Sequence, residues 1–127
     1  MKFTVVHFVV LILIVFGGLI GWQKWSASQP GALDEFAQCL VDEGATFFGA
    51  FWCPHCADQK KMFGNSVDLL PYKECSTPDG QGQTAECNDA GITGYPTWEF
   101  ADGERLNGVV ELETLAEKTG CELPVTE

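Results

Sequence analysis

Basic residues are scarce in this sequence, and most of the chain lacks them almost entirely. The 127 residues contain seven lysines and arginines against 18 aspartates and glutamates, which gives a formal net charge of −11. From residue 26 onward, five basic residues stand against all 18 acidic ones. A domain this acidic is repelled by phosphate backbones and by anionic lipid headgroups. We therefore expect no nucleic-acid partner.

Histidines, which are common zinc ligands, are also few. The sequence has two histidines, and one of them, His7, lies in an apolar N-terminal run. The Cys53-Pro54-His55-Cys56 motif has no second Cys-x-x-Cys pair that could complete a tetrahedral zinc site, so we expect no metal. A purely structural Cys53–Cys56 bridge would close a very short loop and stabilise the fold little. These two exclusions favour a reactive redox pair.

Acidic and basic residues are absent from residues 5–20, which are apolar except for His7 and follow a single lysine, Lys2. Extended through Trp22, the run is about 18 residues long, near the lower limit for a helix that spans a bilayer. The preceding positive charge favours the cytoplasmic side for the N-terminus. The sequence therefore predicts one N-terminal membrane anchor, with the rest of the chain outside the cytoplasm.

The predicted organisation is a membrane anchor at residues 1–25, a linker at 26–32 and one domain at 33–127. A cleaved signal peptide is the alternative, because Ser26-Ala27-Ser28 is a tolerable small-residue cleavage site. In that case the domain would be secreted or periplasmic. Both readings place the domain in an exported compartment.

All six cysteines follow the apolar run, and an even number of them in an oxidising compartment predicts disulfides. With Cys53 and Cys56 set aside, the other four allow three connectivities. Cys75 and Cys87 flank a glycine-rich loop, while Cys39 and Cys121 lie near the two ends of the domain. We expect structural Cys75–Cys87 and Cys39–Cys121 bridges. The alternative is that one of these bridges passes electrons to the Cys53–Cys56 pair.

Hydrophobic periodicity and turn residues predict alternating helices and strands. Helices are expected at residues 33–43, 54–63, 84–90 and 111–119, and strands at 45–52, 72–75, 97–100 and 105–107. Alternation followed by a terminal hairpin predicts an α/β fold with a mixed sheet.

The redox motif is expected where the first strand ends and a helix begins. Pro54 suits the first helical position, which places Cys53 at the helix N-terminus, where the backbone N–H groups stabilise a thiolate. Cys56 would follow one turn later as a shielded resolving thiol behind an exposed Cys53. An imidazole at His55 can donate to the thiolate and tune the pair.

Two stretches of this sequence resemble the thioredoxin superfamily, namely residues 51–56 (FWCPHC) and 91–100 (GITGYPTWEF). The resemblance implies a thioredoxin-like fold with a glutaredoxin-size core, in which four strands of a mixed sheet are flanked by helices. It also implies that Pro96 is cis and packs beside the redox pair. Tyr95, Pro96 and Trp52 would then bind an extended substrate segment.

A narrower resemblance covers residues 36–123 and rests on residues 48–61, 71–75 and 91–98. These are similar to the thioredoxin-like domains fused to, or partnered with, bacterial and archaeal vitamin K epoxide reductase homologues. The resemblance implies a quinone-linked thiol oxidase in the membrane as partner, exported cysteine-containing proteins as clients, and no bound cofactor. The quinone would act only through the partner, and we expect the chain itself to be a monomer.

The predicted function is a membrane-tethered thiol–disulfide oxidoreductase that oxidises exported proteins. Thioredoxins carry a buried carboxylate six positions before the first cysteine, and Phe47 stands there in this chain, which favours an oxidant. One alternative is a disulfide reductase or isomerase fed by a transmembrane electron donor. Another is a non-catalytic tethered binding domain that recruits a partner through an aromatic surface formed by Trp52, Tyr95 and Trp98.

Overall fold

The computed structural model describes residues 2–27 and 30–124, which divide into one compact unit within residues 1–30 and another within 31–127. The first unit is a single helix, α1 (Lys2–Ala27). Its segment Val5–Gln23 has a mean hydropathy of 2.6 and is long and apolar enough to cross a membrane. The helix continues two residues past the expected end of the anchor. Residues 28 and 29 of the expected linker lie outside the described residues.

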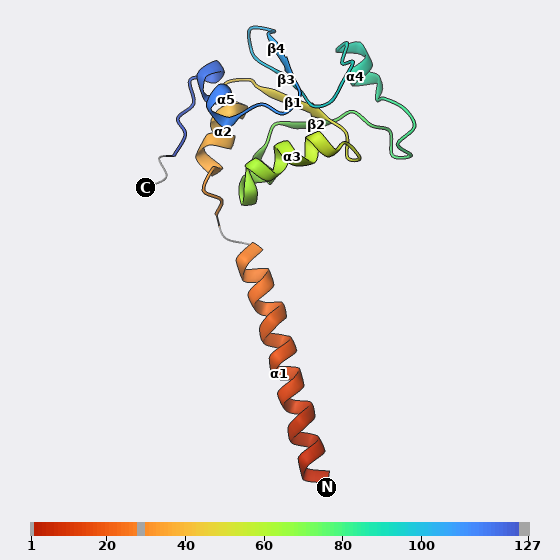
Figure 1. The fold of residues 1–127 in the computed structure, drawn as a ribbon, viewed down its shortest axis with the longest axis vertical. Coiled ribbons are helices and arrows are strands. Elements are labelled where there is room, and N and C mark those ends of the chain that lie inside the picture. Colours follow the sequence, from red (N-terminus) through yellow and green to blue (C-terminus); the bar gives the residue numbers. More distant parts are fainter. Residues whose placement is uncertain (1, 28–29, 125–127) are drawn as a thin grey trace. The chain divides into compact units, whose positions relative to one another are not determined.

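The second unit is built on a four-stranded sheet with the strand order β2-β1-β3-β4. Strand β1 pairs parallel with β2 and antiparallel with β3, and β3 and β4 form the predicted terminal hairpin (Figure 1). The strands are β1 (Thr46–Gly49), β2 (Tyr72–Glu74), β3 (Thr97–Glu99) and β4 (Arg105–Asn107). The helices are α2 (Asp34–Asp42), α3 (Pro54–Met62), the 3₁₀ helix η1 (Gly64–Leu69), α4 (Ala85–Asp89) and α5 (Leu112–Thr119). This arrangement confirms the predicted thioredoxin-like α/β fold.

Strand β1 places one large side chain on each face of the sheet, because neighbouring residues of a strand point in opposite directions. Phe47 belongs to the larger core, where its ring stacks on Trp98 at a centroid distance of 4.9 Å. Phe48 belongs to a smaller cluster with Cys75, Cys87 and Ile92. Both faces of the central strand are therefore covered, which explains why its sequence is apolar without alternation.

The prediction that the first strand runs to residue 52 is wrong. Strand β1 ends at Gly49, and a turn follows in which the Cys53 N–H donates to the Ala50 carbonyl oxygen at 3.0 Å. Phe51 and Trp52 are 59% and 53% exposed. The sequence run looked like a continuous buried strand because both residues are aromatic, yet the chain must turn here to begin α3.

Gln59 is a polar residue in the middle of the core, with none of its surface exposed. Its side-chain oxygen accepts from the Val110 N–H at 2.7 Å and from the Trp98 indole N–H at 3.2 Å. Its amide nitrogen donates to the Val110 carbonyl oxygen at 3.0 Å. One side chain thus ties α3 to β3 and to the segment that precedes α5.

Replacing Gln59 with leucine should lower the free energy of unfolding by about 3–5 kcal/mol, because two buried N–H groups and one carbonyl lose their partner. Denaturant unfolding of the full chain in detergent would measure the loss. The matched control is Gln38→Leu on α2, since Gln38 is exposed and bonds only to Asp42. Equal effects of the two substitutions would contradict the assigned role of Gln59.

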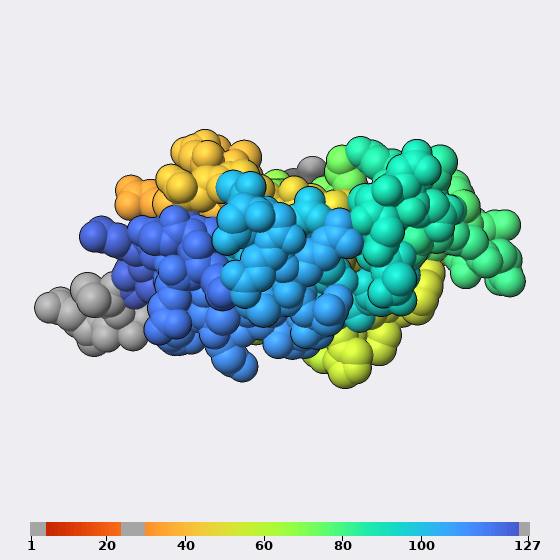
Figure 2. All heavy atoms as spheres, turned by 90° about the horizontal axis from the view of Figure 1, so that it is seen from above, coloured from red at the N-terminus to blue at the C-terminus, as the bar shows by residue number. Residues whose placement is uncertain are grey.

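Two disulfides fasten opposite ends of this unit. Cys39 on α2 is joined to Cys121, which follows α5, over a sequence separation of 82 residues. Cys75 after β2 is joined to Cys87 in α4 over a separation of 12 residues. Figure 2 shows α4 and the loop before it, in teal and green, at the end of the unit opposite to α2 and α5, in orange and blue.

Candidate active site

The two cysteines outside these disulfides lie at the start of α3. Cys53 is the N-cap residue and Pro54 occupies the first helical turn, as the sequence predicts for a helix beginning here. The Cys56 backbone N–H donates to Cys53 Sγ at 3.4 Å. The first turn of α3 therefore directs an N–H group and the positive end of its dipole at the Cys53 sulfur.

Both thiols are buried, which corrects the expectation of an exposed Cys53. The residue is 6% exposed, against 0% for Cys56, so only Cys53 presents any surface. The Cys53 thiol donates to the Tyr95 carbonyl oxygen at 3.8 Å, and the chain around Tyr95 covers it. Cys53 is nevertheless the more accessible of the two thiols, as expected, and Cys56 lies behind it.

The segment that covers Cys53 is held in an unusual backbone conformation. The Tyr95–Pro96 peptide bond is cis, and Pro96 is fully buried beneath the site. The Tyr95 carbonyl group faces the Cys53 sulfur. An incoming sulfur atom must reach Cys53 across this segment, whose backbone can pair with an extended polypeptide.

Aromatic side chains from the turn before Cys53 and from the segment that covers it form a rim beside the thiol. The Trp52 and Tyr95 rings meet edge to face at a centroid distance of 6.0 Å, and Phe51 lies exposed next to Trp52 in the turn. The Trp52 indole N–H donates to Ser76 Oγ at 2.9 Å. The Tyr95 hydroxyl bonds to the side-chain oxygen of Gln83. Both rings are thus oriented by the loop between Cys75 and Cys87.

The Cys75–Cys87 disulfide holds that loop in place and is itself inaccessible. Both cysteines are 0% exposed, and the Cys75 N–H donates to the Gly49 carbonyl oxygen at 2.8 Å. A disulfide with no accessible sulfur is a poor target for an outside thiol. This burial favours a structural role over the alternative of an electron shuttle.

Burial dominates the protonation of Cys56. It raises the pKa of the Cys56 thiol to about 12. A backbone hydrogen bond with Ala50 and the charge of Lys60 lower this pKa, whereas the neighbouring Cys53 raises it further. Burial, followed by Glu74, also raises the pKa of Tyr72 well above its usual range. Near neutral pH the resolving thiol is consequently protonated.

Several expected site residues have a different place in the structure. Trp98 is 0% exposed and stacks in the core, so an aromatic surface that includes Trp98 is ruled out. His55 is exposed, and its side chain makes no hydrogen bond or ion pair with the described residues. Phe47 is fully buried and contacts Tyr72, with ring centroids 5.2 Å apart.

Three residues near the thiols were missed by sequence reasoning, namely Lys60, Tyr72 and Glu74. They converge only because α3 runs beside β2, and Tyr72 pairs in register with Phe47 of β1. A Cβ atom added to Gly49 would meet Tyr72 Cε2 at 2.8 Å and Cys56 Sγ at 3.0 Å. The Tyr72 ring and the Cys56 sulfur therefore both pack against Gly49, where a side chain larger than hydrogen would clash with them.

Two further features lie outside the site. No group of three or more metal-ligating side chains occurs among the described residues.

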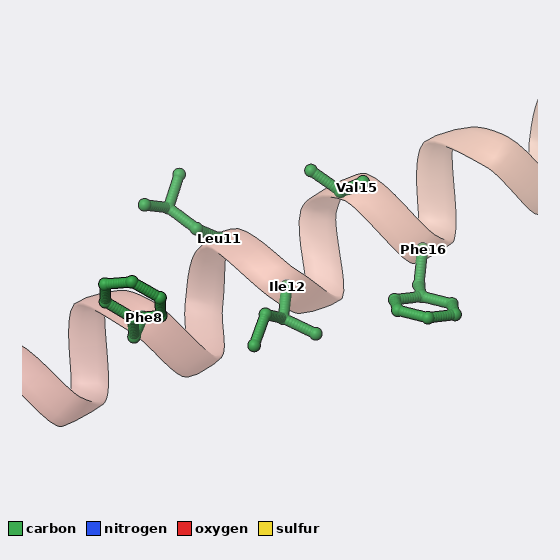
Figure 3. A pocket seen from close by; sticks show the side chains of 5 residues that line it. All are labelled: Phe8, Leu11, Ile12, Val15 and Phe16. Carbon is green, nitrogen blue, oxygen red and sulfur yellow. The ribbon is translucent and has the colours of Figure 1, made fainter.

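Helix α1 carries a shallow, wholly apolar groove along one side (Figure 3). The groove is lined by Phe8, Leu11, Ile12, Val15 and Phe16. With no polar atom to orient a substrate, it is typical of a lipid-facing helix surface.

Comparison with curated proteins finds a thiol-disulfide oxidoreductase among the relatives of this chain. Over 103 residues the chain is 45% identical to the thiol-disulfide oxidoreductase LTO1 of Arabidopsis thaliana. The alignment covers 77% of this chain and 27% of that protein, so the chain spans about a quarter of the relative's length. No known family model matches the chain.

Proposed function

We propose that this chain is a thiol–disulfide oxidoreductase whose working group is the Cys53–Cys56 pair, and that it acts as an oxidant of exported proteins. The observation that carries the proposal is the position of Cys53 at the N-cap of α3, directly beneath the Tyr95 carbonyl and the cis-Pro96 segment. The name of the plant relative supports the reaction class. The absence of a carboxylate at Phe47 favours the oxidising direction.

The reaction begins with the Cys53–Cys56 disulfide. A client thiolate attacks Cys53 Sγ, a mixed disulfide forms, and Cys56 Sγ leaves with the electron pair of the broken bond and takes up a proton from solvent. A second client thiolate then attacks the client sulfur of the mixed disulfide and displaces Cys53 as a thiolate. The client gains one disulfide, and the pair on the protein gains two electrons.

The residues around Cys53 have separate roles in this scheme. The N-terminus of α3 stabilises the Cys53 thiolate as a leaving group, and His55, two residues further on, would tune it through its charge, since its side chain makes no hydrogen bond with the described residues. Trp52, Tyr95 and Pro96 hold the client segment in an extended conformation. Stabilising the reduced pair in this way makes its disulfide a stronger oxidant.

The proposal includes a membrane tether and a partner. Helix α1 would anchor the chain, with the acidic domain on the extracytoplasmic side, which accords with the apolar segment Val5–Gln23. A quinone-linked thiol oxidase in the same membrane would accept the two electrons and restore the disulfide. Tethering raises the effective concentration of the domain at such a partner.

The oxidised full chain in detergent should transfer its disulfide to a reduced, unfolded secreted protein such as ribonuclease A. Recovery of ribonuclease activity and loss of the Cys53–Cys56 disulfide would be measured together. We expect a reduction potential nearer to the strong oxidants, at about −120 mV, than to thioredoxin, at about −270 mV. A potential near thioredoxin's, with no disulfide transfer, would instead support the reductase or isomerase alternative.

A further inference from the structure

Lys60 is the exception among the basic residues of the thiol-bearing unit. The other four, Lys61, Lys73, Arg105 and Lys118, each form a salt bridge with a carboxylate. Lys60 has no carboxylate partner among the described residues, although the domain carries a large excess of acidic residues. Lys60 is half-buried, and its ammonium group contacts no carboxylate although the domain is strongly acidic.

The ammonium group of Lys60 is seated on an aromatic ring. Its Nζ atom lies 3.4 Å from the centroid of the Tyr72 ring, which is a favourable cation–π geometry. The ring is fixed at its far end, where the Tyr72 hydroxyl donates to Glu74 Oε2 at 2.7 Å. The second oxygen, Glu74 Oε1, accepts from the backbone N–H groups of Ser76 and Phe51 at 2.8 and 3.2 Å.

Among the described residues of this unit, Lys60 is the one lysine or arginine without a carboxylate partner, and its charge acts on the resolving cysteine. Lys60 lies one helical turn after Cys56, on the same face of α3, and Tyr72 shares with Cys56 the space above Gly49. We propose that Lys60, seated on Tyr72, stabilises the Cys56 thiolate during disulfide exchange and so acts as a positioning residue for the buried sulfur. The inference rests on the proposed function of the pair.

The chemistry explains why such a charge is needed. When a client thiolate attacks Cys53, Cys56 Sγ must leave as a thiolate in a site where burial alone disfavours the charged form. In the reverse step, Cys56 attacks the mixed disulfide as a thiolate and displaces the client thiolate from Cys53. The same positive charge favours both directions, because they pass through one transition state in which Cys56 Sγ carries part of the negative charge.

The other titratable groups that face Cys56 supply no positive charge. Cys53 lies on the same helix, Tyr72 comes from β2 with Glu74 behind it, and Tyr95 comes from the segment before β3. The ionised form of each would be an anion. Lys60 is therefore the one group around the sulfur whose charge favours the thiolate.

The test isolates the step that only Cys56 performs. A mixed disulfide between Cys53 and glutathione is prepared on the full chain in detergent, and release of glutathione is followed against pH. Lys60→Met should slow release about three- to tenfold near neutral pH and shift the pH profile toward higher pH. Lys60→Arg, which keeps the charge and stacks on Tyr72, should restore the wild-type profile.

The matched control is Lys61→Met, the next residue on α3, whose ammonium group is exposed and pairs with Asp58. It should leave the profile unchanged. If Lys60→Met fails to fold, Tyr72→Leu, which removes the seat of the ammonium group, should show the same shift. A Lys60→Met profile equal to that of Lys61→Met would overturn the inference while the wild-type protein still exchanges. Absence of exchange in the wild type would instead overturn the proposed function.

Discussion

Replacing Cys56 with alanine should leave the protein covalently attached to its clients. The Cys53 thiolate would attack a disulfide already present in a client and displace one client sulfur as a thiolate, but the Cys56 thiol that could then attack Cys53 and release the client would be missing. Non-reducing electrophoresis of membranes from cells that express the variant should show client adducts that disappear on reduction. The trapped proteins would also identify the client set.

Two further variants serve as controls for this experiment. Cys53→Ala should form no adducts, because the fully buried Cys56 presents no surface to a client. Cys75→Ala together with Cys87→Ala should form none beyond the wild-type level, since both substituted cysteines lie outside the reactive pair. Adducts that persist in Cys53→Ala, or no adducts in Cys56→Ala, would contradict the roles assigned to the two thiols.

Removing the Cys39–Cys121 bridge should cause the largest loss of stability among the disulfides. The bridge joins residues 82 positions apart, and closing a loop of that length restricts the unfolded chain by about 4 kcal/mol. The double variant Cys39→Ala/Cys121→Ala should lose about that much free energy of unfolding in denaturant titrations. Disulfide exchange at Cys53 should continue in the fraction that remains folded.

The Cys75–Cys87 bridge supplies the comparison, because its separation of 12 residues corresponds to about 3 kcal/mol on the same basis. Its removal should cost less stability but should disturb the site more, since its loop orients Trp52 and Tyr95. A larger loss of stability from the short bridge than from the long one would contradict the loop-length argument.

The sequence predicted the order of the strands and α-helices from local signals, but it did not predict the 3₁₀ helix η1. Pro54 marks the start of α3, and Gly44 and Gly120, both with positive φ, follow the ends of α2 and α5. The sequence could not predict where β1 ends, because Phe51 and Trp52 have the composition of a buried strand but lie in a turn. Hydrophobicity alone does not separate a core aromatic residue from one that forms a rim.

The reactive pair was predictable from its motif, whereas its surroundings depend on tertiary structure. Trp98 and Trp52 are the same residue type, yet the first is a core residue bonded to Gln59 and the second is exposed. Tyr72 reaches Cys56 only through the parallel register of β1 and β2. Such contacts join residues far apart in the chain, so local sequence patterns do not predict them.

The Cys75–Cys87 sulfurs are inaccessible, so this bridge cannot accept electrons from the neighbouring Cys53–Cys56 pair. The bridge is linked to the redox motif through Ser76 and Trp52, but its two sulfurs are closed to any approaching thiol. Electrons delivered to Cys53–Cys56 consequently have no second disulfide at this end of the domain into which they can pass. In the proposed reaction the adjoining bridge would therefore stay oxidised while the Cys53–Cys56 pair cycles, and the site would work as a two-electron carrier.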